Sequence, residues 1–342
     1  MKLSDFHYDV PEEAIAQHPA VKRGDSRLIV LDRQEASIAH RRFTDVLDYL
    51  EEGDVLVVNE TQVFPARLTG LRLSTGAQVE IFLLREVEPD VWTTLVKPAR
   101  KAKLGDRFQI GDALHGEVVG LEESGGRVMR FSYEGDFNQI IDNVGSVPLP
   151  PYIKRQAEPE DTARYQSIFA EKRGAVAAPT ANLHFDEAIV QKIEAKGVQI
   201  VPVLLHVGLG TFRPVTVEDV TQHKMDAEYF EVSPESAEAV NAALARGSRV
   251  IAVGTTAVRV LESSVDEAGR LLAGSGWTEK FIYPPYEFKI IKGLVTNFHQ
   301  PGSTLILLVS ALGGKDFVLK AYNEAVEQGY RFFSYGDAML II

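Results

Sequence analysis

The stretch between residues 66 and 147 differs in pattern from the chain on either side of it, and this limits how the chain can fold. Short runs of alternating hydrophobicity are broken there by glycine and aspartate, which is typical of strands joined by tight turns. The Pro-Leu-Pro-Pro segment at residues 148–151 ends the stretch. We predict an all-β module of about six strands, a small barrel, over residues 65–148. Its expected strands include residues 78–84, 92–96, 107–110, 116–121 and 127–133.

On both sides of this module, continuous apolar runs alternate with segments of helical spacing. A strand that is apolar throughout, such as residues 54–59, is expected where helices cover both faces of a sheet. We therefore predict an α/β unit made of residues 1–64 and 149–342, with the all-β module inserted into it. Expected strands are residues 27–31, 54–59, 174–178, 198–205, 249–253 and 289–296. Expected helices are residues 43–50, 161–171, 186–196, 234–246, 256–264, 303–312 and 316–328.

The chain contains no cysteine, which excludes disulfides, thiolate zinc sites and a cysteine nucleophile. Its first residues do not read as a signal peptide, and no apolar run approaches the length of a membrane span. We expect a soluble, cytoplasmic protein with no membrane partner.

The formal net charge of −12 argues against a general nucleic-acid coat protein, although phosphate binding depends on local patches rather than on total charge. One basic cluster is opposed by a single acid, Asp106. It consists of Lys97, Arg100, Lys101, Lys103 and Arg107. We take it as a candidate tRNA-binding surface, and a solvated hairpin rich in Lys and Arg is the alternative that the sequence leaves open.

Polar and glycine-bearing segments follow the predicted strands, and ligands of α/β proteins gather at such strand ends. These segments are residues 59–62, 179–185, 205–214, 254–256 with Arg259, 297–304 and 334–337. Folding alone favours apolar residues there, so the sequence predicts one shared active site. Six unrelated structural loops are the alternative.

Three of these segments carry a histidine, namely His184, His206 and His299, and histidine exchanges protons near neutral pH. A hydrogen-bonded structural role is the alternative for each of them. Metal binding by the three is not predicted, because no His-x-x-x-His or His-Glu-x-x-His spacing occurs. The Gly-Thr-Thr segment at residues 254–256 opens a helix, whose free amides suit a carboxylate or phosphate unless it is an ordinary Thr cap.

The glycine-rich fingerprints of Rossmann and P-loop sites are absent, and so is the Gly-x-Ser-x-Gly nucleophile elbow. Aromatic residues that either stack on a flat heterocycle or belong to the core are Phe185, Phe212, Tyr283, Tyr286 and Phe298. Residue chemistry alone therefore indicates an α/β enzyme that handles a polar, heterocyclic substrate.

Seven segments, in one order along the chain, resemble the signature segments of the S-adenosylmethionine:tRNA ribosyltransferase-isomerase family. They are residues 59–67, 148–153, 177–185, 206–215, 253–259, 296–299 and 330–341. Asn182 stands where a small residue such as Gly or Ser is usual, Pro285 replaces a Gly, and Gln300 replaces a common Leu. These departures concern loop geometry rather than the class of activity.

The resemblance implies a distorted (β/α) barrel-like main domain with an inserted β-barrel domain, in agreement with the pattern above. It also implies the late stages of bacterial queuosine synthesis. The ribosyl part of S-adenosylmethionine would be transferred to 7-aminomethyl-7-deazaguanine at the wobble position of a tRNA with a GUN anticodon. Isomerisation would give epoxyqueuosine, with release of adenine and methionine. S-adenosylmethionine is then a co-substrate, and no prosthetic group is expected.

Roles for the matched residues follow from this implied reaction, which needs a base beside the sulfonium and an acid for the departing adenine. The acid–base candidates are His184, His206 and His299, with Asp337 and Glu228 as carboxylates. Residues expected at the methionine carboxylate are Thr255, Thr256 and Arg259. Gly208 and Gly210 would admit the nucleoside, and Phe212, Phe298 or Tyr335 would stack on a base. Further expected substrate contacts are Asn59, Thr61, Arg67, Thr180, Phe185, Thr211, Arg213, Tyr283 and Asn297.

Two other classes of function remain open from the sequence. One is a different S-adenosylmethionine enzyme, such as a methyltransferase, which would release no free adenine. The other is a tRNA-binding module without catalysis that uses the basic cluster, although such a module needs few polar strand ends.

Overall fold

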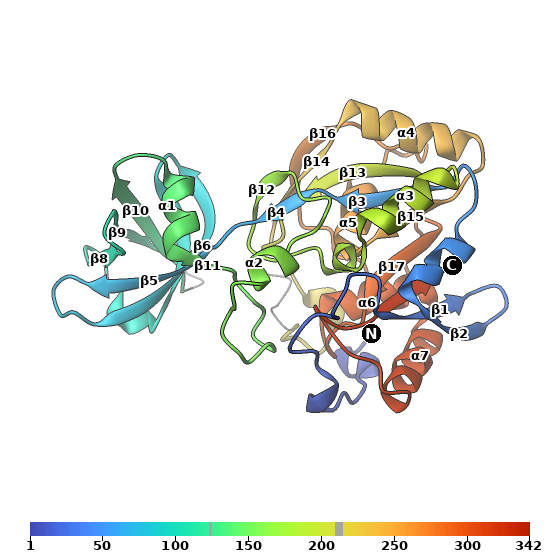
Figure 1. Cartoon of the computed structure of the whole chain (residues 1–342), viewed down its shortest axis with the longest axis horizontal. Coiled ribbons are helices and arrows are strands. Elements are labelled where there is room, and N and C mark those ends of the chain that lie inside the picture. Colours follow the sequence, from blue (N-terminus) through green and yellow to red (C-terminus); the bar gives the residue numbers. More distant parts are fainter. Residues whose placement is uncertain (123–124, 209–214) are drawn as a thin grey trace.

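The computed structural model describes residues 1–122, 125–208 and 215–342 and contains two sheet-based units joined side by side (Figure 1). The larger unit is built on a nine-stranded mixed sheet, and the smaller is a β-barrel. This arrangement confirms the predicted fold class, an α/β main unit with an inserted all-β barrel. Within the described part of the chain, no helix is both long and apolar enough to cross a membrane.

The order of the strands in the main sheet is β16 (Gly274–Thr278), β14 (Glu228–Val232), β13 (Gln199–Leu205), β3 (Val55–Asn59), β15 (Val250–Val253), β17 (Gly293–Asn297), β18 (Ala338–Ile341), β1 (Arg27–Asp32) and β2 (Ser37–Arg42). The four strands from β13 to β17 are parallel. β18 runs antiparallel to β17 and parallel to β1. The beginnings of β18 and β1 therefore lie at the same edge of the sheet as the ends of the four parallel strands.

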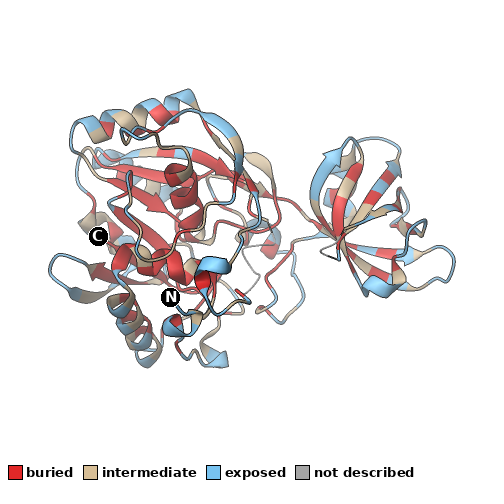
Figure 2. Cartoon of the chain, turned by 180° about the vertical axis from the view of Figure 1, so that it is seen from behind, coloured by how far each residue is buried: buried red, intermediate tan, exposed pale blue. Residues whose placement is uncertain are grey.

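Helices cover both faces of this sheet, which explains the continuous apolar runs (Figure 2). Along β3, Val55 and Val57 join one core, whereas Leu56 and Val58 join the other, because successive side chains of a strand point to opposite faces. The first core includes α4 (Pro234–Ala245), α5 (Thr255–Ser263), α6 (Thr304–Gly313) and α7 (Lys315–Glu327). The second includes α3 (Glu187–Ala195) and the 3-10 helix η3 (Phe43–Tyr49), where the sequence predicted an α-helix.

The barrel is antiparallel and closed. Its strands follow the order β5 (Arg67–Arg72), β6 (Gln78–Glu88), β7 (Val91–Lys97), β10 (Arg127–Tyr133), β9 (Leu114–Leu121) and β8 (Arg107–Ile110), and β8 pairs back with β5. A short strand, β11 (Gly145–Ser146), extends the sheet beside β5. The sequence pattern missed α1 (Phe137–Val144), which contributes Ile141 to the barrel core.

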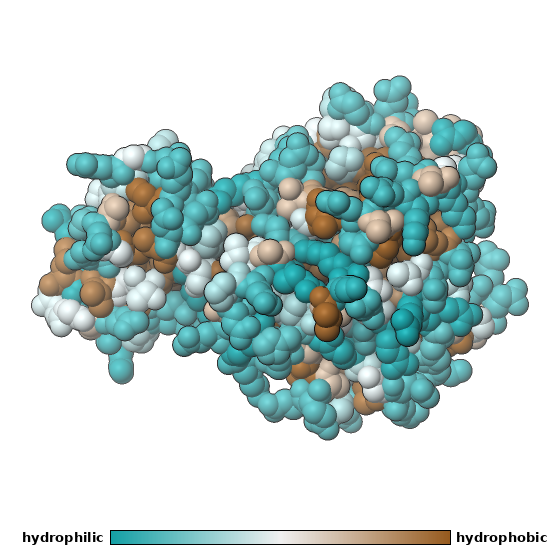
Figure 3. Space-filling model, in the orientation of Figure 1, coloured by the Kyte–Doolittle hydropathy of each residue, from teal (hydrophilic) through white to brown (hydrophobic). Residues whose placement is uncertain are grey.

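The surface in Figure 3 is mainly hydrophilic, with apolar residues gathered toward the far end of the barrel. Exposed apolar side chains of the barrel include Leu71, Leu73, Leu104 and Leu121.

The predicted helix at residues 161–171 is wrong beyond its first turn. α2 (Asp161–Arg164) ends at Tyr165, and the Gln166 amide then exchanges two hydrogen bonds with the backbone of Val63 in β4 (Thr61–Val63). These two hydrogen bonds hold the segment after Tyr165 against β4, which pairs with β12 (Lys172–Ala175). Further short 3-10 segments among the described residues are η1 (Leu3–Phe6), η2 (Glu12–Ala14), η4 (Ala99–Lys101), η5 (Thr180–His184) and η7 (Val220–Gln222).

We expect Gly145→Ala to destabilise the protein, because a Cβ atom there would lie 2.1 Å from the carbonyl oxygen of Pro65 and 2.7 Å from that of Ile141. Backbone atoms cannot give way as a flexible side chain does, so the loss should be about 1–3 kcal/mol. Thermal unfolding measures it. Gly276→Ala, whose Cβ would meet only the Phe230 ring at 3.6 Å, is the control. Equal melting temperatures for the two variants would contradict the packing argument.

Candidate active site

The edge of the main sheet at which the four parallel strands end is called the working edge. One buried amide, that of Asn59, fixes the strand ends there. The side-chain nitrogen of Asn59 donates to the Leu205 carbonyl at 2.9 Å and to Thr256 Oγ1 at 3.2 Å. Its side-chain oxygen accepts from the backbone amides of Thr61 and Leu205, each at 3.1 Å. The Asn59 carbonyl in turn accepts from Asn182 Nδ2 at 2.8 Å. Asn59 therefore ties the end of β3 to β13, β4, α5 and η5.

Beside this amide lies the central pocket, which encloses about 770 Å³ of space, part of it open to solvent. Six of the predicted site residues line it: Thr180, Thr255, Thr256, Asn297, Phe298 and His299. They come from the ends of β15 and β17 and from η5, as expected for strand ends. Ser334 also lines the pocket, since it precedes β18 and so reaches the edge where β17 ends.

His299 is held rigidly in the wall of the central pocket. Its Nε2 lies 2.7 Å from Thr296 Oγ1, its backbone amide donates to the Tyr322 hydroxyl, and its carbonyl accepts from the Tyr8 hydroxyl. Burial lowers the pKa of His299 to about 3. The ring is therefore neutral near pH 7, and its orientation is fixed by neighbours on both the side chain and the backbone.

The start of α5 faces the same pocket. Gly254, with φ +86°, is the N-cap residue, and no side chain caps the helix there, so the ordinary Thr cap considered as the alternative is not formed. Gly254, Thr255 and Thr256 all line the pocket. Free amides, the positive end of the helix dipole and two hydroxyls together suit a carboxylate or phosphate.

A second cavity, the arginine pocket, adjoins the first and takes in His184 and Tyr335. Nδ1 of His184 lies 2.8 Å from Ser26 Oγ, and the ring stacks on Phe43. Burial lowers the pKa of His184 to about 4, an effect that nearby Arg23 and Arg331 reinforce and the Asn297 amide opposes.

A third cavity, the barrel cleft, lies between the barrel and the main unit and contains His206, Gly208 and Glu228. His206 Nδ1 lies 2.8 Å from Thr61 Oγ1, and the ring stacks on Tyr229. The ring also fills the space beside Gly174, where a Cβ atom would approach it to 2.5 Å. Burial lowers the pKa of His206 as well.

In the barrel cleft, the Glu228 carboxylate binds a backbone amide and an arginine of the main unit. It accepts from the Gly208 amide at 2.8 Å and forms a buried ion pair with Arg259. Arg259 donates further to the carbonyls of Thr278 and Lys280. Its charge is thus engaged with Glu228 and does not line the central pocket beside Thr255 and Thr256, where the sequence placed it.

Four other predicted residues lie apart from the three cavities. Asp337 accepts from the backbone amides of Arg27 and Arg331, and burial raises its pKa. Phe185 is fully buried against Phe43 and Phe169.

Arg67 lies on β5, where it forms an ion pair with Glu80, and Tyr283 packs against Phe281 at the margin of the core. Gly210, Thr211, Phe212 and Arg213 lie outside the described residues.

The basic cluster lies on the barrel, at the end of β7, through η4 and at the start of β8. Its side chains are exposed or half-exposed, and Arg107 pairs with Glu117 at 3.0 Å.

The single shared pocket expected from the sequence is in fact divided into three adjoining cavities. Val207 lines both the central pocket and the barrel cleft, and Ser334 lines both the central pocket and the arginine pocket. The walls between the cavities are therefore only a few residues thick.

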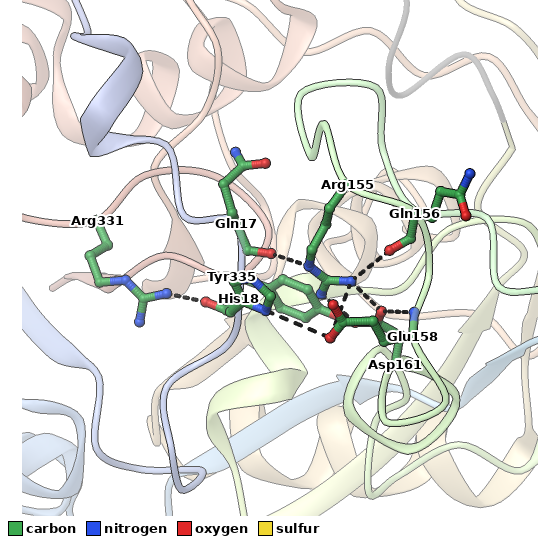
Figure 4. A network of polar contacts seen from close by, with 8 residues as sticks. All are labelled: Gln17, His18, Arg155, Gln156, Glu158, Asp161, Arg331 and Tyr335. Carbon is green, nitrogen blue, oxygen red and sulfur yellow. Dashed lines mark hydrogen bonds and ion pairs between the residues drawn. The ribbon is translucent and has the colours of Figure 1, made fainter.

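Sequence reasoning missed the residues that hold the outer wall of the central pocket. Tyr152 lies 2.6 Å from Ser334 Oγ through its hydroxyl and packs on Phe333. Behind it, buried Asp161 accepts two hydrogen bonds from Arg155 and one from the Tyr335 hydroxyl, and the Asp161 pKa falls to about 2 (Figure 4). Tyr152 belongs to residues 148–153, one of the segments that resemble the family signatures, but its proline-rich pattern was interpreted only as the end of the β-module.

Among the described residues, no three His, Asp or Glu side chains are grouped so that they could hold a metal ion.

Comparisons with known proteins agree over the whole chain. A family model described as "Queuosine biosynthesis protein" matches residues 3–341. Proteins named S-adenosylmethionine:tRNA ribosyltransferase-isomerase from Desulforamulus reducens and Clostridioides difficile are each 53% identical, and one from Symbiobacterium thermophilum is 54% identical, with 100% of both chains covered. A solved structure of an S-adenosylmethionine tRNA ribosyltransferase from Thermotoga maritima is 38% identical, with a TM-score of 0.57, and the match covers 99% of this chain and 100% of that one.

We predict that His184 and His299 stay neutral down to about pH 5 in the folded protein, because burial lowers their pKa values to about 4 and about 3. In the unfolded chain a histidine titrates near pH ~6.5, so the unfolded state takes up protons as the pH falls below this value. Folding stability should therefore decrease from about pH 6.5 toward pH 4.

Ring-proton NMR of the folded enzyme checks this, with the urea-denatured chain as the control in which every histidine titrates. Titration of either folded residue between about pH 5.5 and 7.5 would show that its burial does not hold the neutral form.

Proposed function

The chain belongs to the queuosine biosynthesis protein family, and from this premise we propose that it acts as an S-adenosylmethionine:tRNA ribosyltransferase-isomerase. The observation that carries the proposal is the central pocket, in which a helix N-terminus, two hydroxyls and a neutral histidine converge at the ends of parallel strands. Such a pocket suits a zwitterionic nucleoside more than a phosphorylated cofactor.

The proposed reaction transfers the ribosyl group of S-adenosylmethionine to the aminomethyl group of 7-aminomethyl-7-deazaguanine at the wobble position of a GUN anticodon. The ribose is isomerised to an epoxycyclopentanediol, and epoxyqueuosine-tRNA, adenine and methionine are the products. We propose that this takes place in the cytoplasm, with S-adenosylmethionine as co-substrate and no prosthetic group.

In the central pocket, the methionine carboxylate would bind at Thr255, Thr256 and the amides of the first turn of α5. Neutral His299 suits a site for a sulfonium, since a charged imidazole would repel the positive sulfur. The Asn297 amide also lines this pocket, where its nitrogen donates to the Phe333 carbonyl at 3.0 Å and the amide interacts with the His184 ring.

In the barrel cleft, His206 is the best placed candidate base. Thr61 fixes its ring, its lowered pKa keeps it neutral, and a neutral imidazole can accept the proton beside the sulfonium. Trp92, Tyr229 and Trp277 also line this cleft and offer faces on which the wobble base could stack. Val207 lines both cavities, so the barrel cleft adjoins the central pocket.

The test of the function is incubation of the enzyme with S-adenosylmethionine and a tRNA that carries the deazaguanine precursor. We expect free adenine and methionine in equal amounts, and mass analysis should show the cyclopentane unit on the wobble nucleoside. His206→Ala should reduce turnover at saturating substrate by about 10²–10⁴-fold, the usual value of a general base.

Exposed His115, on the barrel strand β9, provides the control variant His115→Ala, which should retain wild-type turnover. Methylated tRNA without adenine release would point to a methyltransferase instead. Unchanged turnover in His206→Ala would remove the base role from His206 while leaving the reaction itself in place.

For tRNA binding we propose the basic cluster on the barrel. Lys101→Glu combined with Lys103→Glu should weaken tRNA binding and lower the slope of log Kd against log salt, because fewer counterions are released. A matched change of charge at Lys292 and Lys320, two exposed lysines of the main unit, is the control. Filter binding at several salt concentrations measures both variants, and equal affinities for the two would place tRNA elsewhere.

A further inference from the structure

The arginine pocket has a lining that the proposed reaction does not use. It encloses about 330 Å³, part of it open to solvent, and its lining residues include Lys22, Arg23 and Arg164 together with buried His184. No Asp or Glu is among its described lining residues. We propose that this pocket binds a phosphate group, supplied either by the tRNA backbone or by free phosphate.

Backbone carbonyls hold the two guanidinium groups in place. Arg23 donates to the carbonyls of Leu183, Ala163 and Gln166 at 3.3, 2.9 and 2.5 Å. Arg164 donates to the carbonyls of Val21 and Ala20 at 3.0 and 2.6 Å. Neutral carbonyls fix the geometry of a guanidinium without cancelling its charge. Both groups are therefore preorganised for an anion and retain their full positive charge.

The two arginines are also close enough to repel one another. Burial, followed by the charge of Arg164, lowers the pKa of Arg23. Asp186 acts in the opposite direction, although its carboxylate also caps α3 by accepting from the Ile189 amide. An anion between like charges removes this repulsion, so a phosphate gains from both guanidinium groups at once.

Lys22 and His184 are the other two basic residues of the lining. Lys22 is exposed, so its ammonium is accessible to a ligand from solvent. His184 is 5% exposed, and its ring is held by Ser26 on Nδ1 and by the Asn297 amide, so it forms a rigid, neutral part of the wall.

The position of the pocket favours an RNA phosphate over a free one. Ser334 lines both the arginine pocket and the central pocket, and η5 contributes residues to both. A tRNA strand that reaches the central pocket would therefore carry a neighbouring phosphodiester past Arg23 and Arg164. This choice of source rests on the proposed function, whereas the phosphate chemistry of the pocket does not.

The test measures binding without S-adenosylmethionine, so that it does not depend on turnover. Two probes are used with the full-length enzyme: unmodified tRNA by fluorescence anisotropy, and inorganic phosphate by calorimetry. Lys22→Glu should raise the Kd for tRNA about tenfold, as for one lost charge-assisted contact, and lower its salt slope by about 1. Lys320→Glu, the same change on an exposed face of α7, should leave both probes unaffected.

Arg164→Gln provides a second variant, with circular dichroism to verify its fold. Weaker binding of both probes by Lys22→Glu assigns the site to the tRNA backbone. Weaker binding of phosphate alone assigns it to free phosphate. Wild-type affinity for both probes in Lys22→Glu overturns the proposal. An enzyme that binds both probes as expected but releases no adenine would refute the proposed function and leave the phosphate site standing.

Discussion

The hydrogen bonds of Asn59 are the contact on which the rest of the working edge depends. A buried amide that loses a partner costs about 1–3 kcal/mol, so all of its bonds favour one arrangement of the surrounding segments. Thr256 Oγ1, bound to Asn59 Nδ2, lines the central pocket. The Thr61 amide, bound to Asn59 Oδ1, positions the hydroxyl that meets His206 in the barrel cleft. One side chain thus sets the relative position of two cavities.

The three cavities differ in charge, and this difference separates the chemistry that each can hold. The described residues that line the central pocket include no Lys, Arg, Asp or Glu, and its histidine is neutral. The charged residues among the described lining of the arginine pocket are all cationic, whereas the barrel cleft contains Arg85 and Arg173 as well as Glu86 and Glu228. Under the proposed function, a substrate with a positive sulfur and a partner with many phosphates would be met by separate surfaces.

Much of this organisation follows from the sequence, because periodicity depends on local residue spacing. The alternating runs of the barrel and the apolar runs of β3 and β15 were recognisable for this reason. β14 and the edge strand β16 were missed because most of their residues are half-buried or exposed, so no apolar run marks them. The helix expected after Asp161 failed because Gln166 pairs with Val63, a residue far away in the sequence.

The same limit applies to the site. Thr180, Thr255, Thr256, Asn297 and His299 were found because the ends of parallel strands meet at one edge. Arg259 and Asp337 lie outside the predicted shared pocket. Glu228 engages the charge of Arg259, and the backbone amides of Arg27 and Arg331 engage that of Asp337. Spacing along the chain does not reveal such partners.

The pairing of β1 with β18 brings together, inside the sheet, two strands that lie far apart in the sequence. The barrel strands are neighbours in the sequence, whereas β1 can pair with β18 only after all the residues between them have been synthesised. The main sheet, and the working edge with it, therefore depends on pairings of much longer range than those of the barrel.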